Sequence, residues 1–276
     1  MSCRLPALPF LLLLALAGCA QHSLLITSQA PAPLTIQAPY HGDFKHYTLA
    51  LTWQPGFCLL HGQNTCKPDQ PQTPLIGLHG LWASRPSDLI KNHQDVIIWW
   101  KKGCSIYADA APAPTVPALS SGLSTRLSSV VAHLPSDLVA HEYTKHASCF
   151  GMNAEQFFTV AATLRDRFAA LPVSTQITAK AGQIISKSEL QALIQTDTGP
   201  LPEKGLQFQC NKDSTGRMVL AQLWFTLKPE KLGEFPHASS FISSPWEQDN
   251  CPTHFLLPNW DTIKGTASST PTKAAP

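Results

Sequence analysis

Residues 141–149 read His-Glu-Tyr-Thr-Lys-His-Ala-Ser-Cys and place four ionisable side chains and a cysteine in nine consecutive positions. On a helix, His141 and Lys145 lie one turn apart, and Glu142 and His146 lie one turn apart on the neighbouring side. Packing alone rarely gathers such groups, because charged side chains and imidazoles are costly to remove from water. The stretch therefore predicts a helix that opens near Pro135 and presents a functional polar face.

A zinc-binding helix is one alternative for this stretch. It requires a second imidazole four residues after the first, so that both ring nitrogens reach one metal ion. That position is Lys145, whose charge repels a metal ion, and His146 follows His141 by five residues. We therefore expect neither a metal ligand nor a cofactor here. Taken alone, the stretch is also compatible with a solvated polar helix face.

The composition allows one substantial hydrophobic core or two small ones, since the chain has 276 residues of which 43% are hydrophobic. A formal net charge of +2 excludes a histone-like nucleic-acid wrapper. The 11 histidines would make the chain markedly more cationic in mild acid, because a free imidazole titrates near pH ~6.5. A positive charge that grows in mild acid suits binding of a polyanionic substrate under mildly acidic conditions.

Residues 1–19 have the pattern of an export signal. Arg4 supplies a positive charge, and the apolar run over residues 10–17 is too short to cross a bilayer as a helix. The run ends in Leu-Ala-Gly-Cys, which resembles a bacterial lipobox and would make Cys19 a lipid anchor; cleavage by an ordinary signal peptidase is the alternative. In both cases we expect the protein to leave the cytosol, as a periplasmic, outer-membrane-anchored or secreted protein.

In an exported protein the cysteines are expected to form disulfides, because the compartment is oxidising. Cys3 and Cys19 belong to the signal, and the others are Cys58, Cys66, Cys104, Cys149, Cys210 and Cys251. An even number in an oxidising compartment predicts three disulfides among 15 possible pairings, with two free buried thiols as the alternative. Cys58 and Cys66 are close enough in the sequence to staple the loop between them.

Strand and helix patterns are mixed without a regular βαβ rhythm. Alternating or continuously apolar runs predict strands over residues 45–53, 75–82, 206–210 and 218–227, and a short last strand is expected over residues 254–257. Helical patterns cover residues 88–101, 121–133 and 153–171, and a capping sequence at Ser186 opens a further helix. We expect an α+β domain over residues 44–261 with a mostly antiparallel sheet, a loop over 54–73, a flexible linker over 20–43 and a disordered tail over 262–276.

A third imidazole lies inside the expected strand Leu-Ile-Gly-Leu-His-Gly-Leu-Trp at residues 75–82. His79 stands between Gly77 and Gly80, and glycines within a strand leave room for another group to approach the backbone. Taken alone, His79 and Trp82 are more simply explained as core residues.

Together with the histidines of residues 141–149, His79 suggests cleavage of an RNA phosphodiester. One imidazole would take the proton of the 2′-hydroxyl, another would protonate the leaving 5′-oxygen, and cations or hydrogen-bond donors would hold the phosphorane charge. Because the RNA carries its own nucleophile, this reaction needs no metal ion.

Three segments together resemble the ribonuclease T2 family, and their order and spacing match that family as well. The segments are Leu-Thr-Trp-Gln-Pro-Gly-Phe-Cys at residues 51–58, Leu-His-Gly-Leu-Trp at residues 78–82, and the stretch at residues 141–149. The resemblance extends over about residues 44–260 and is strongest to the family's bacterial periplasmic branch. It implies an α+β fold whose antiparallel sheet is flanked by helices.

The resemblance also implies a role for each polar residue of the two histidine segments. His146 would take the 2′-hydroxyl proton and His79 would protonate the leaving group. His141 would contact the phosphate, and Glu142 and Lys145 would stabilise the pentacoordinate transition state. The family's disulfides correspond here to Cys104–Cys149 and Cys210–Cys251, which leaves Cys58–Cys66.

Trp82 would line a base-binding site by the same resemblance. Two departures from the family pattern are Ala83, where proline is common, and Ala147-Ser148, where Gly-Thr is common. The first puts the shape of the loop over residues 83–87, and with it the base preference, in doubt.

The implied activity is that of a metal-independent, monomeric endoribonuclease of low base specificity. It would cleave single-stranded RNA, not DNA, to 2′,3′-cyclic phosphate ends and serve RNA catabolism or scavenging. One alternative is a non-catalytic RNA-binding or toxin/inhibitor-like relative, which would need no acid–base pair. Another is a zinc hydrolase, which would lose activity in EDTA.

Overall fold

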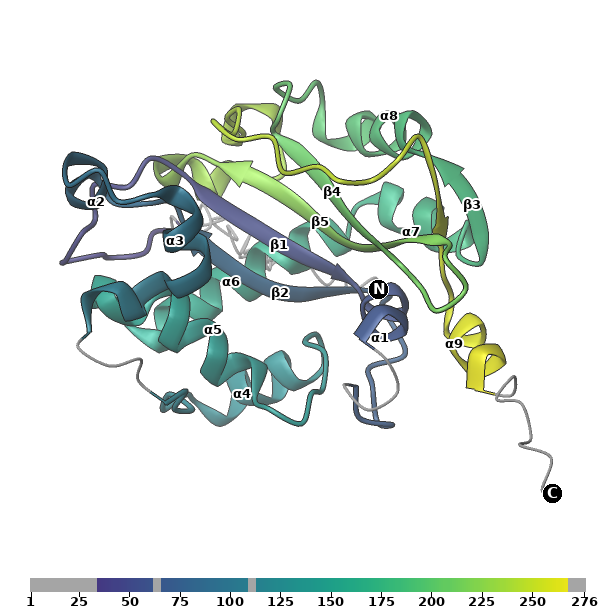
Figure 1. Cartoon of the computed structure of the whole chain (residues 1–276), viewed down its shortest axis with the longest axis horizontal. Helices are drawn as coiled ribbons and strands as arrows, with labels where there is room; N and C mark the ends of the chain where they lie inside the picture. The colour runs from purple at the N-terminus through teal and green to yellow at the C-terminus, as the bar shows by residue number, and fades with distance from the viewer. Residues whose placement is uncertain (1–33, 62–65, 109–112, 268–276) are drawn as a thin grey trace, which may run out of the picture. The chain divides into compact units, whose positions relative to one another are not determined.

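A six-stranded sheet runs through the domain (Figure 1). Strand β1 (Tyr47–Trp53) pairs antiparallel with β2 (Ile76–Ala83) on one side and with β5 (Met218–Leu227) on the other. The antiparallel pairs β4 (Leu206–Lys212) with β5 and β3 (Gln183–Ser186) with β6 (His254–Leu257) complete it, while β5 meets β6 in parallel at one residue pair. The expected mostly antiparallel sheet is confirmed.

The computed structural model describes residues 34–61, 66–108 and 113–267. The expected export signal and most of the expected linker lie outside these residues. Within them, no helix is long and apolar enough to cross a membrane.

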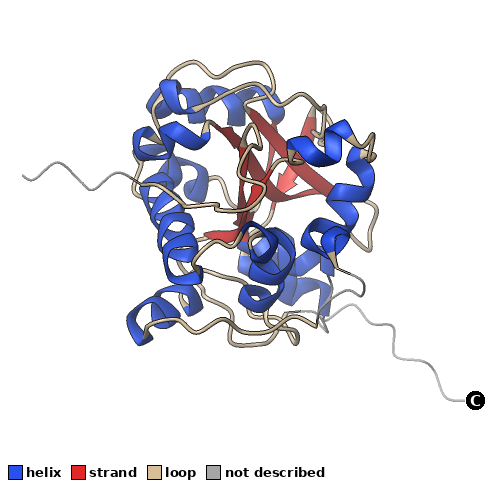
Figure 2. Ribbon diagram, turned by 90° about the vertical axis from the view of Figure 1, so that its left-hand side faces the viewer, coloured by secondary structure: helices blue, strands red, loops and turns tan. Residues whose placement is uncertain are grey.

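Helices flank the sheet, as the ribbon view in Figure 2 shows. They are α1 (Gln54–His61), α2 (Ser87–Lys91), α3 (Val96–Lys102), α4 (Ser121–Ser128), α5 (Leu138–His146), α6 (Ala154–Ala169), α7 (Pro172–Ala179), α8 (Lys187–Thr198) and α9 (Trp260–Ala267). The α+β class is therefore confirmed.

Local capping fixes where several helices begin. The Asp137 side chain accepts a hydrogen bond from the Ala140 amide at 2.8 Å and caps α5. The helix therefore begins at Leu138, three residues after Pro135, where its start was expected. The predicted caps of α6 and α8 are confirmed, because Asn153 and Ser186 accept from the backbone amides three residues later.

Several expected boundaries were wrong. The expected helix over residues 88–101 divides into α2 and α3, because His93 has a left-handed φ of 55° and Asp95 caps a new helix start. The expected loop after β1 begins with α1, since Pro55 fits the first turn of a helix, where its missing N–H is not needed. At the other end, α9 includes residues 262–267 of the expected tail, and residues 268–276 lie outside the described part.

Three disulfides join the pairs that the resemblance implied, Cys58–Cys66, Cys104–Cys149 and Cys210–Cys251. The second joins the short helix that follows α3 (Gly103–Tyr107) to the turn that follows α5 (Ser148–Phe150). The C-terminal end of α5, which carries the candidate site residues Lys145 and His146, is thus covalently linked to the segment that follows α3.

Candidate active site

Helix α5 lies against strand β2 because Gly80 offers no side chain at their close approach. A Cβ atom on Gly80 would overlap the Glu142 carboxylate and the indole nitrogen of Trp82. The expectation that glycine makes room beside His79 is confirmed at this residue. His79 and Trp82 of β2 therefore share one space with the polar face of α5.

Gly103 contacts the C-terminal turn of α5. It has a φ of +53°, and a Cβ atom there would overlap the backbone carbonyl of Lys145. The neighbouring Cys104 forms the disulfide to Cys149. These contacts hold the last turn of α5, which carries Lys145 and His146, in a set position.

Glu142 is the centre of the site. Its side chain is 2% exposed, Oε2 accepts a hydrogen bond from Trp82 Nε1 at 2.7 Å, and Oε1 lies 3.4 Å from His79 Nε2. Burial opposes ionisation of this carboxyl, but its electrostatic interactions with His146 and His79 and the hydrogen bond from Trp82 outweigh the burial and lower its pKa to about 2. A buried carboxylate thus lies among the histidines.

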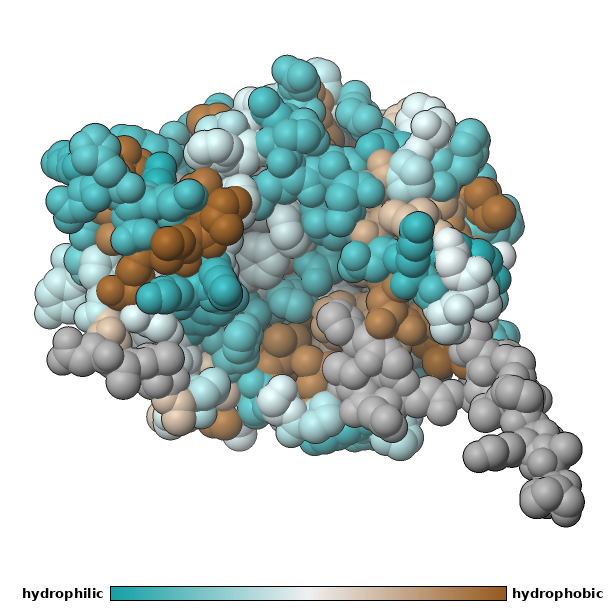
Figure 3. All heavy atoms as spheres, in the orientation of Figure 1, coloured by the Kyte–Doolittle hydropathy of each residue, from teal (hydrophilic) through white to brown (hydrophobic). Residues whose placement is uncertain are grey.

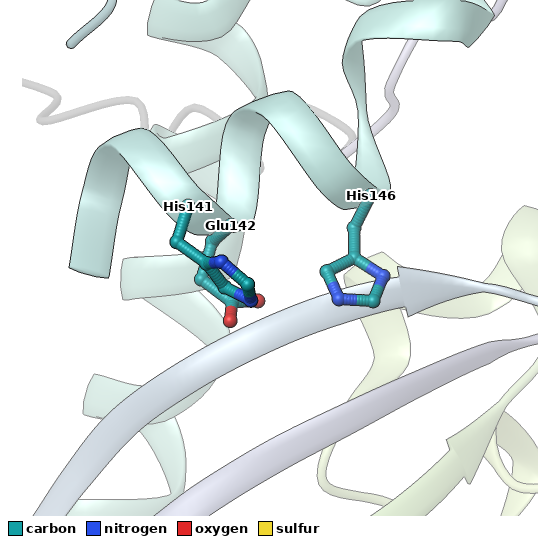
Figure 4. Close-up of side chains that lie close together, drawn as sticks. All are labelled: His141, Glu142 and His146. Atoms are coloured by element: carbon teal, nitrogen blue, oxygen red, sulfur yellow. The ribbon is translucent and has the colours of Figure 1, made fainter. Parts of the chain in front are cut away.

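His141 and His146 point from α5 in the same direction as Glu142 (Figure 4). The His146 ring stacks on Trp82 with centroids 5.3 Å apart, and the His141 ring meets it edge to face at 6.4 Å. Burial lowers the pKa of both imidazoles, against the opposing charge of Glu142. Both rings are therefore held toward the neutral form in the free protein.

His141, Glu142 and His146 could also hold a metal ion, since one ligand atom of each lies within 4.8 Å of the others. Two features weigh against this use. The charge of Lys145 acts on both histidines, and the Glu142 oxygens already face Trp82 and His79. Both features argue against a metal ion held by these three side chains.

These side chains line a cleft of about 570 Å³. Its walls also carry Lys45, His46, Arg85, Trp100, Trp224 and Trp246. Three permanent cations, Lys45, Arg85 and Lys145, line the cleft, and Glu142 is the one acidic lining residue in the described part of the chain. None of the three cations forms an ion pair with a described residue. The cleft is built to attract an anion.

A family model for the ribonuclease T2 family matches residues 44–239. The chain belongs to the ribonuclease T2 family. It is 26% identical to ribonuclease I of Escherichia coli (strain K12) over 259 residues, which cover 85% of this chain and 93% of that protein. The predicted resemblance, including its bacterial branch, is confirmed.

Two solved structures share the ribonuclease T2 fold with this chain. The SF11-RNase of Nicotiana alata superimposes with a TM-score of 0.55 at 18% identity, covering 79% of this chain and all (100%) of that one. RNase NT, solved in complex with 5′-AMP, has a TM-score of 0.51 at 16% identity and covers 78% of this chain and 98% of its own. At these identities the likeness shows the fold.

The departure from the ribonuclease T2 pattern at Ala83 lies at the end of β2. Its carbonyl accepts a hydrogen bond from Trp99 Nε1 at 3.3 Å, which ties the strand end to α3. The departure at Ala147-Ser148 lies beyond α5, where Ala147 is buried and its amide closes the helix on the Tyr143 carbonyl. Ala83 lines the cleft with the histidines, whereas Ala147 and Ser148 do not.

Sequence analysis missed Gln222 and Trp224 of β5, which complete the surroundings of His79. The Trp224 indole donates to Gln222 Oε1 at 2.6 Å, and Gln222 Nε2 lies 3.4 Å from His79 Nδ1. An indole N–H can only donate, so the Gln222 oxygen must face Trp224 and its NH₂ must face His79. The neutral His79 ring accepts at Nδ1 and carries its proton on Nε2, toward Glu142.

The sequence indicates that Gln222 and Trp224 share a face of a strand, but not that this face borders His79. Gln222 and Trp224 are two apart on a strand and so share a face. Which face of β5 borders His79 depends on the pairing of β5 with β1 and of β1 with β2, and nothing local in residues 218–227 specifies that order.

Replacing Gln222 with leucine should alter the proton position on His79. Without the NH₂ donor, only the Glu142 carboxylate beside Nε2 favours the Nε2–H form of neutral His79. The preference for that tautomer should therefore weaken, and we expect turnover to fall about three- to tenfold. Nitrogen-15 NMR of the ring at alkaline pH measures the tautomer directly. Trp224→Phe should give the same tautomer change, because the amide is then free to turn; an unchanged tautomer in both variants would contradict this assignment.

His46 is a fourth imidazole of the cleft that sequence analysis did not select. Burial lowers its pKa to about 4. The pKa of His46 is lower in the folded protein than the value near ~6.5 in the unfolded chain. Folding is therefore favoured by neutral His46 above pH ~6.5, and this contribution to the unfolding free energy is lost as the pH falls toward 4.

His46→Gln should remove this pH dependence. The unfolding free energy of the variant should fall by about 1–2 kcal/mol less between pH 7 and pH 5 than that of the unaltered protein. Urea unfolding at both pH values tests this, and an equal loss in both proteins would contradict it.

Proposed function

We propose that this protein is an exported endoribonuclease that cleaves single-stranded RNA without a metal ion. The single observation that carries the proposal is that His79 of β2 and His146 of α5 line one cleft whose unpaired cations suit a phosphate. Membership of the ribonuclease T2 family and the similarity to ribonuclease I of Escherichia coli agree with this substrate. The sequence of residues 1–19 supports export to the periplasm, and its lipobox-like end supports lipid attachment at Cys19.

The first step is attack of the 2′-hydroxyl on the neighbouring phosphorus. His146 is suited to take the hydroxyl proton, because burial lowers its pKa and keeps the ring neutral near pH 7. The new bond joins the 2′-oxygen to phosphorus and gives a pentacoordinate anion. Lys145 and His141, which line the same cleft, supply positive charge or N–H donors to its oxygens.

The second step breaks the bond between phosphorus and the 5′-oxygen. His79 protonates this oxygen from Nε2, and the ionised Glu142 at 3.4 Å favours the charged ring that this step requires. A charged His79 carries a proton on Nδ1 as well, so the Gln222 amide must turn or withdraw from the position it holds in the free protein. The products are a 2′,3′-cyclic phosphate and a free 5′-hydroxyl.

The aromatic lining of the cleft supports low base specificity. Trp82 borders the phosphate position, with its ring against His146 and its N–H on Glu142. Aromatic rings stack on any of the four bases, because every base has a π-face. We assign Trp82 to the base nearest the cleaved bond.

Product analysis on a defined oligoribonucleotide in EDTA tests the proposed function. We expect cleavage to persist in the chelator and to leave 2′,3′-cyclic phosphate ends, while the matching oligodeoxyribonucleotide stays intact. Binding of RNA without any cyclic phosphate would instead support a non-catalytic relative. Loss of cleavage in EDTA with recovery on adding Zn²⁺ would support a metal site at His141, Glu142 and His146.

A further inference from the structure

Two tryptophan rings meet at the cleft from separate parts of the chain. Trp100 lies in the last turn of α3, and Trp246 lies in the segment over residues 244–248, which follows β5 in the chain. Their ring centroids are 6.1 Å apart at an interplanar angle of 90°, and both residues line the cleft. Trp100 is 36% exposed and Trp246 is 42% exposed, so each keeps an open ring surface.

Hydrogen bonds of neighbouring residues fix the backbone segments that carry the two rings. The Trp99 indole bonds to the Ala83 carbonyl and positions the end of α3. The segment with Trp246 is fixed by backbone and side-chain bonds of Gln248 with Gln207 and Gln209, and by Ser244 Oγ at 2.9 Å from the Trp246 carbonyl. Two large aromatic side chains are thus exposed on fixed backbone, which is how a binding surface is prepared in advance.

These rings are distinct from the aromatic residue beside the histidines. Trp82 packs on His146 and donates to Glu142. In the described part of the chain, Trp100 and Trp246 have no ring contact, hydrogen bond or ion pair with any of the histidines of the site. The two tryptophans therefore belong to the same cleft but not to the position of the cleaved phosphate.

The charges around the pair favour a nucleotide. Arg85 lines the same cleft; its Nη1 donates to the Gln94 carbonyl, and its charge forms no ion pair with a described residue. Lys101 and Lys102 are exposed directly after Trp100. Aromatic planes beside unpaired cations are the combination that single-stranded nucleic acid uses, with a base on the ring and a phosphate on the cation.

A hydrophobic patch adjoins the pair on α2 and α3, and Figure 3 shows it as a brown area surrounded by hydrophilic residues. Ile97 and Ile98 belong to it and are 56% and 39% exposed. These isoleucines do not line the cleft, whereas Trp100 and Trp246 do. Continuity with the cleft therefore favours the RNA substrate as the occupant of the tryptophan pair over a membrane or a second protein.

We propose that Trp100 and Trp246 form an additional subsite, which stacks a nucleobase of the RNA beyond the two nucleotides that flank the cleaved bond. The inference rests on the proposed function, because the same RNA chain occupies both places. It gives the protein a preference for oligonucleotides over dinucleotides. The base identity should matter little, since stacking is tolerant of sequence.

Steady-state cleavage of a diribonucleotide and a hexaribonucleotide of the same base composition tests the subsite. Trp246→Ala and Trp100→Ala should each lower kcat/KM on the hexanucleotide about tenfold, mainly through KM, and change it less than about twofold on the dinucleotide. Trp246→Tyr should restore most of the loss, because the ring face returns. Ile97→Ala, on the same exposed helix but outside the cleft, is the matched control and should change neither substrate.

Three outcomes would overturn the subsite. Equal losses on both substrates would place the tryptophans at the cleaved nucleotides, and no loss on either would remove them from RNA binding. Loss of binding to anionic phospholipid vesicles in Trp100→Ala, with hexanucleotide cleavage intact, would assign the surface to a membrane.

A separate measurement keeps this inference apart from the proposed function. Binding of an uncleavable hexadeoxyribonucleotide, followed by quenching of tryptophan fluorescence, should weaken about tenfold in Trp246→Ala even if the protein cleaves no RNA. Circular dichroism and thermal unfolding of each variant show that the fold is retained. Unchanged binding of this probe by correctly folded variants would contradict the subsite.

Discussion

Replacing His146 with alanine should lower kcat on RNA by about 10²–10⁴-fold, the range of a group that transfers a proton in the transition state. The ring is held in place by its stack on Trp82 at 5.3 Å and by the end of α5, which Gly103 and the Cys104–Cys149 disulfide fix. Its loss removes the base for the 2′-hydroxyl while the cations of the cleft remain. The measurement is initial-rate cleavage of a diribonucleotide at pH 6–7.

His93→Asn is the matched control for this loss. His93 is exposed in the turn between α2 and α3 and has a φ of 55°, which asparagine tolerates. It does not line the cleft, and its replacement should leave the rate unchanged. His79→Ala should reduce the rate as severely as His146→Ala, and full activity in either histidine variant would reject the acid–base assignment.

Replacing Glu142 with glutamine should lower kcat about 10²-fold with little change of shape. Glutamine can still accept the Trp82 N–H, but it is neutral and turns an NH₂ group toward His79 Nε2, where a carboxylate oxygen lies 3.4 Å away. The charged form of His79 then loses its nearest negative partner. Cleavage kinetics together with thermal unfolding separate this chemical effect from a loss of fold.

Glu203→Gln serves as the control for removal of one carboxylate. Glu203 is exposed in the loop before β4 and does not line the cleft. Its neutral variant should keep the rate of the unaltered protein. Equal rates for Glu142→Gln and the unaltered protein would mean that Glu142 shapes the site without contributing charge to the reaction.

The sequence predicted those parts of the fold that depend on local signals. The strands over residues 218–227 and 254–257 are found at the predicted bounds, because apolar runs between turn residues mark them. The helix starts after Asn153 and Ser186 follow from side chains that can accept backbone N–H groups. The closeness of Cys58 and Cys66 in the sequence indicated their pairing, whereas Cys104–Cys149 and Cys210–Cys251 came from the family resemblance.

Elements whose identity depends on tertiary packing were missed. Helix α7 begins with Pro172, which fits a helix start but also a loop, and β3 is a strand of four residues that needs its partner β6 to be recognised. Likewise, Gly80 showed that a group approaches β2, whereas its position against Glu142 required the coordinates. The contact of Gln222 with His79 depends on the strand order, which places β5 next to β1.

A crystal structure with a diribonucleotide analogue tests the central claim most directly. The analogue carries fluorine in place of the attacking 2′-hydroxyl, so that it binds without being cleaved. We predict that the phosphorus lies between the rings of His79 and His146, with the 2′-substituent within about 4 Å of a His146 nitrogen and the 5′-oxygen within about 4 Å of His79 Nε2. A phosphate bound outside this position, or both rings on one side of it, would contradict the account.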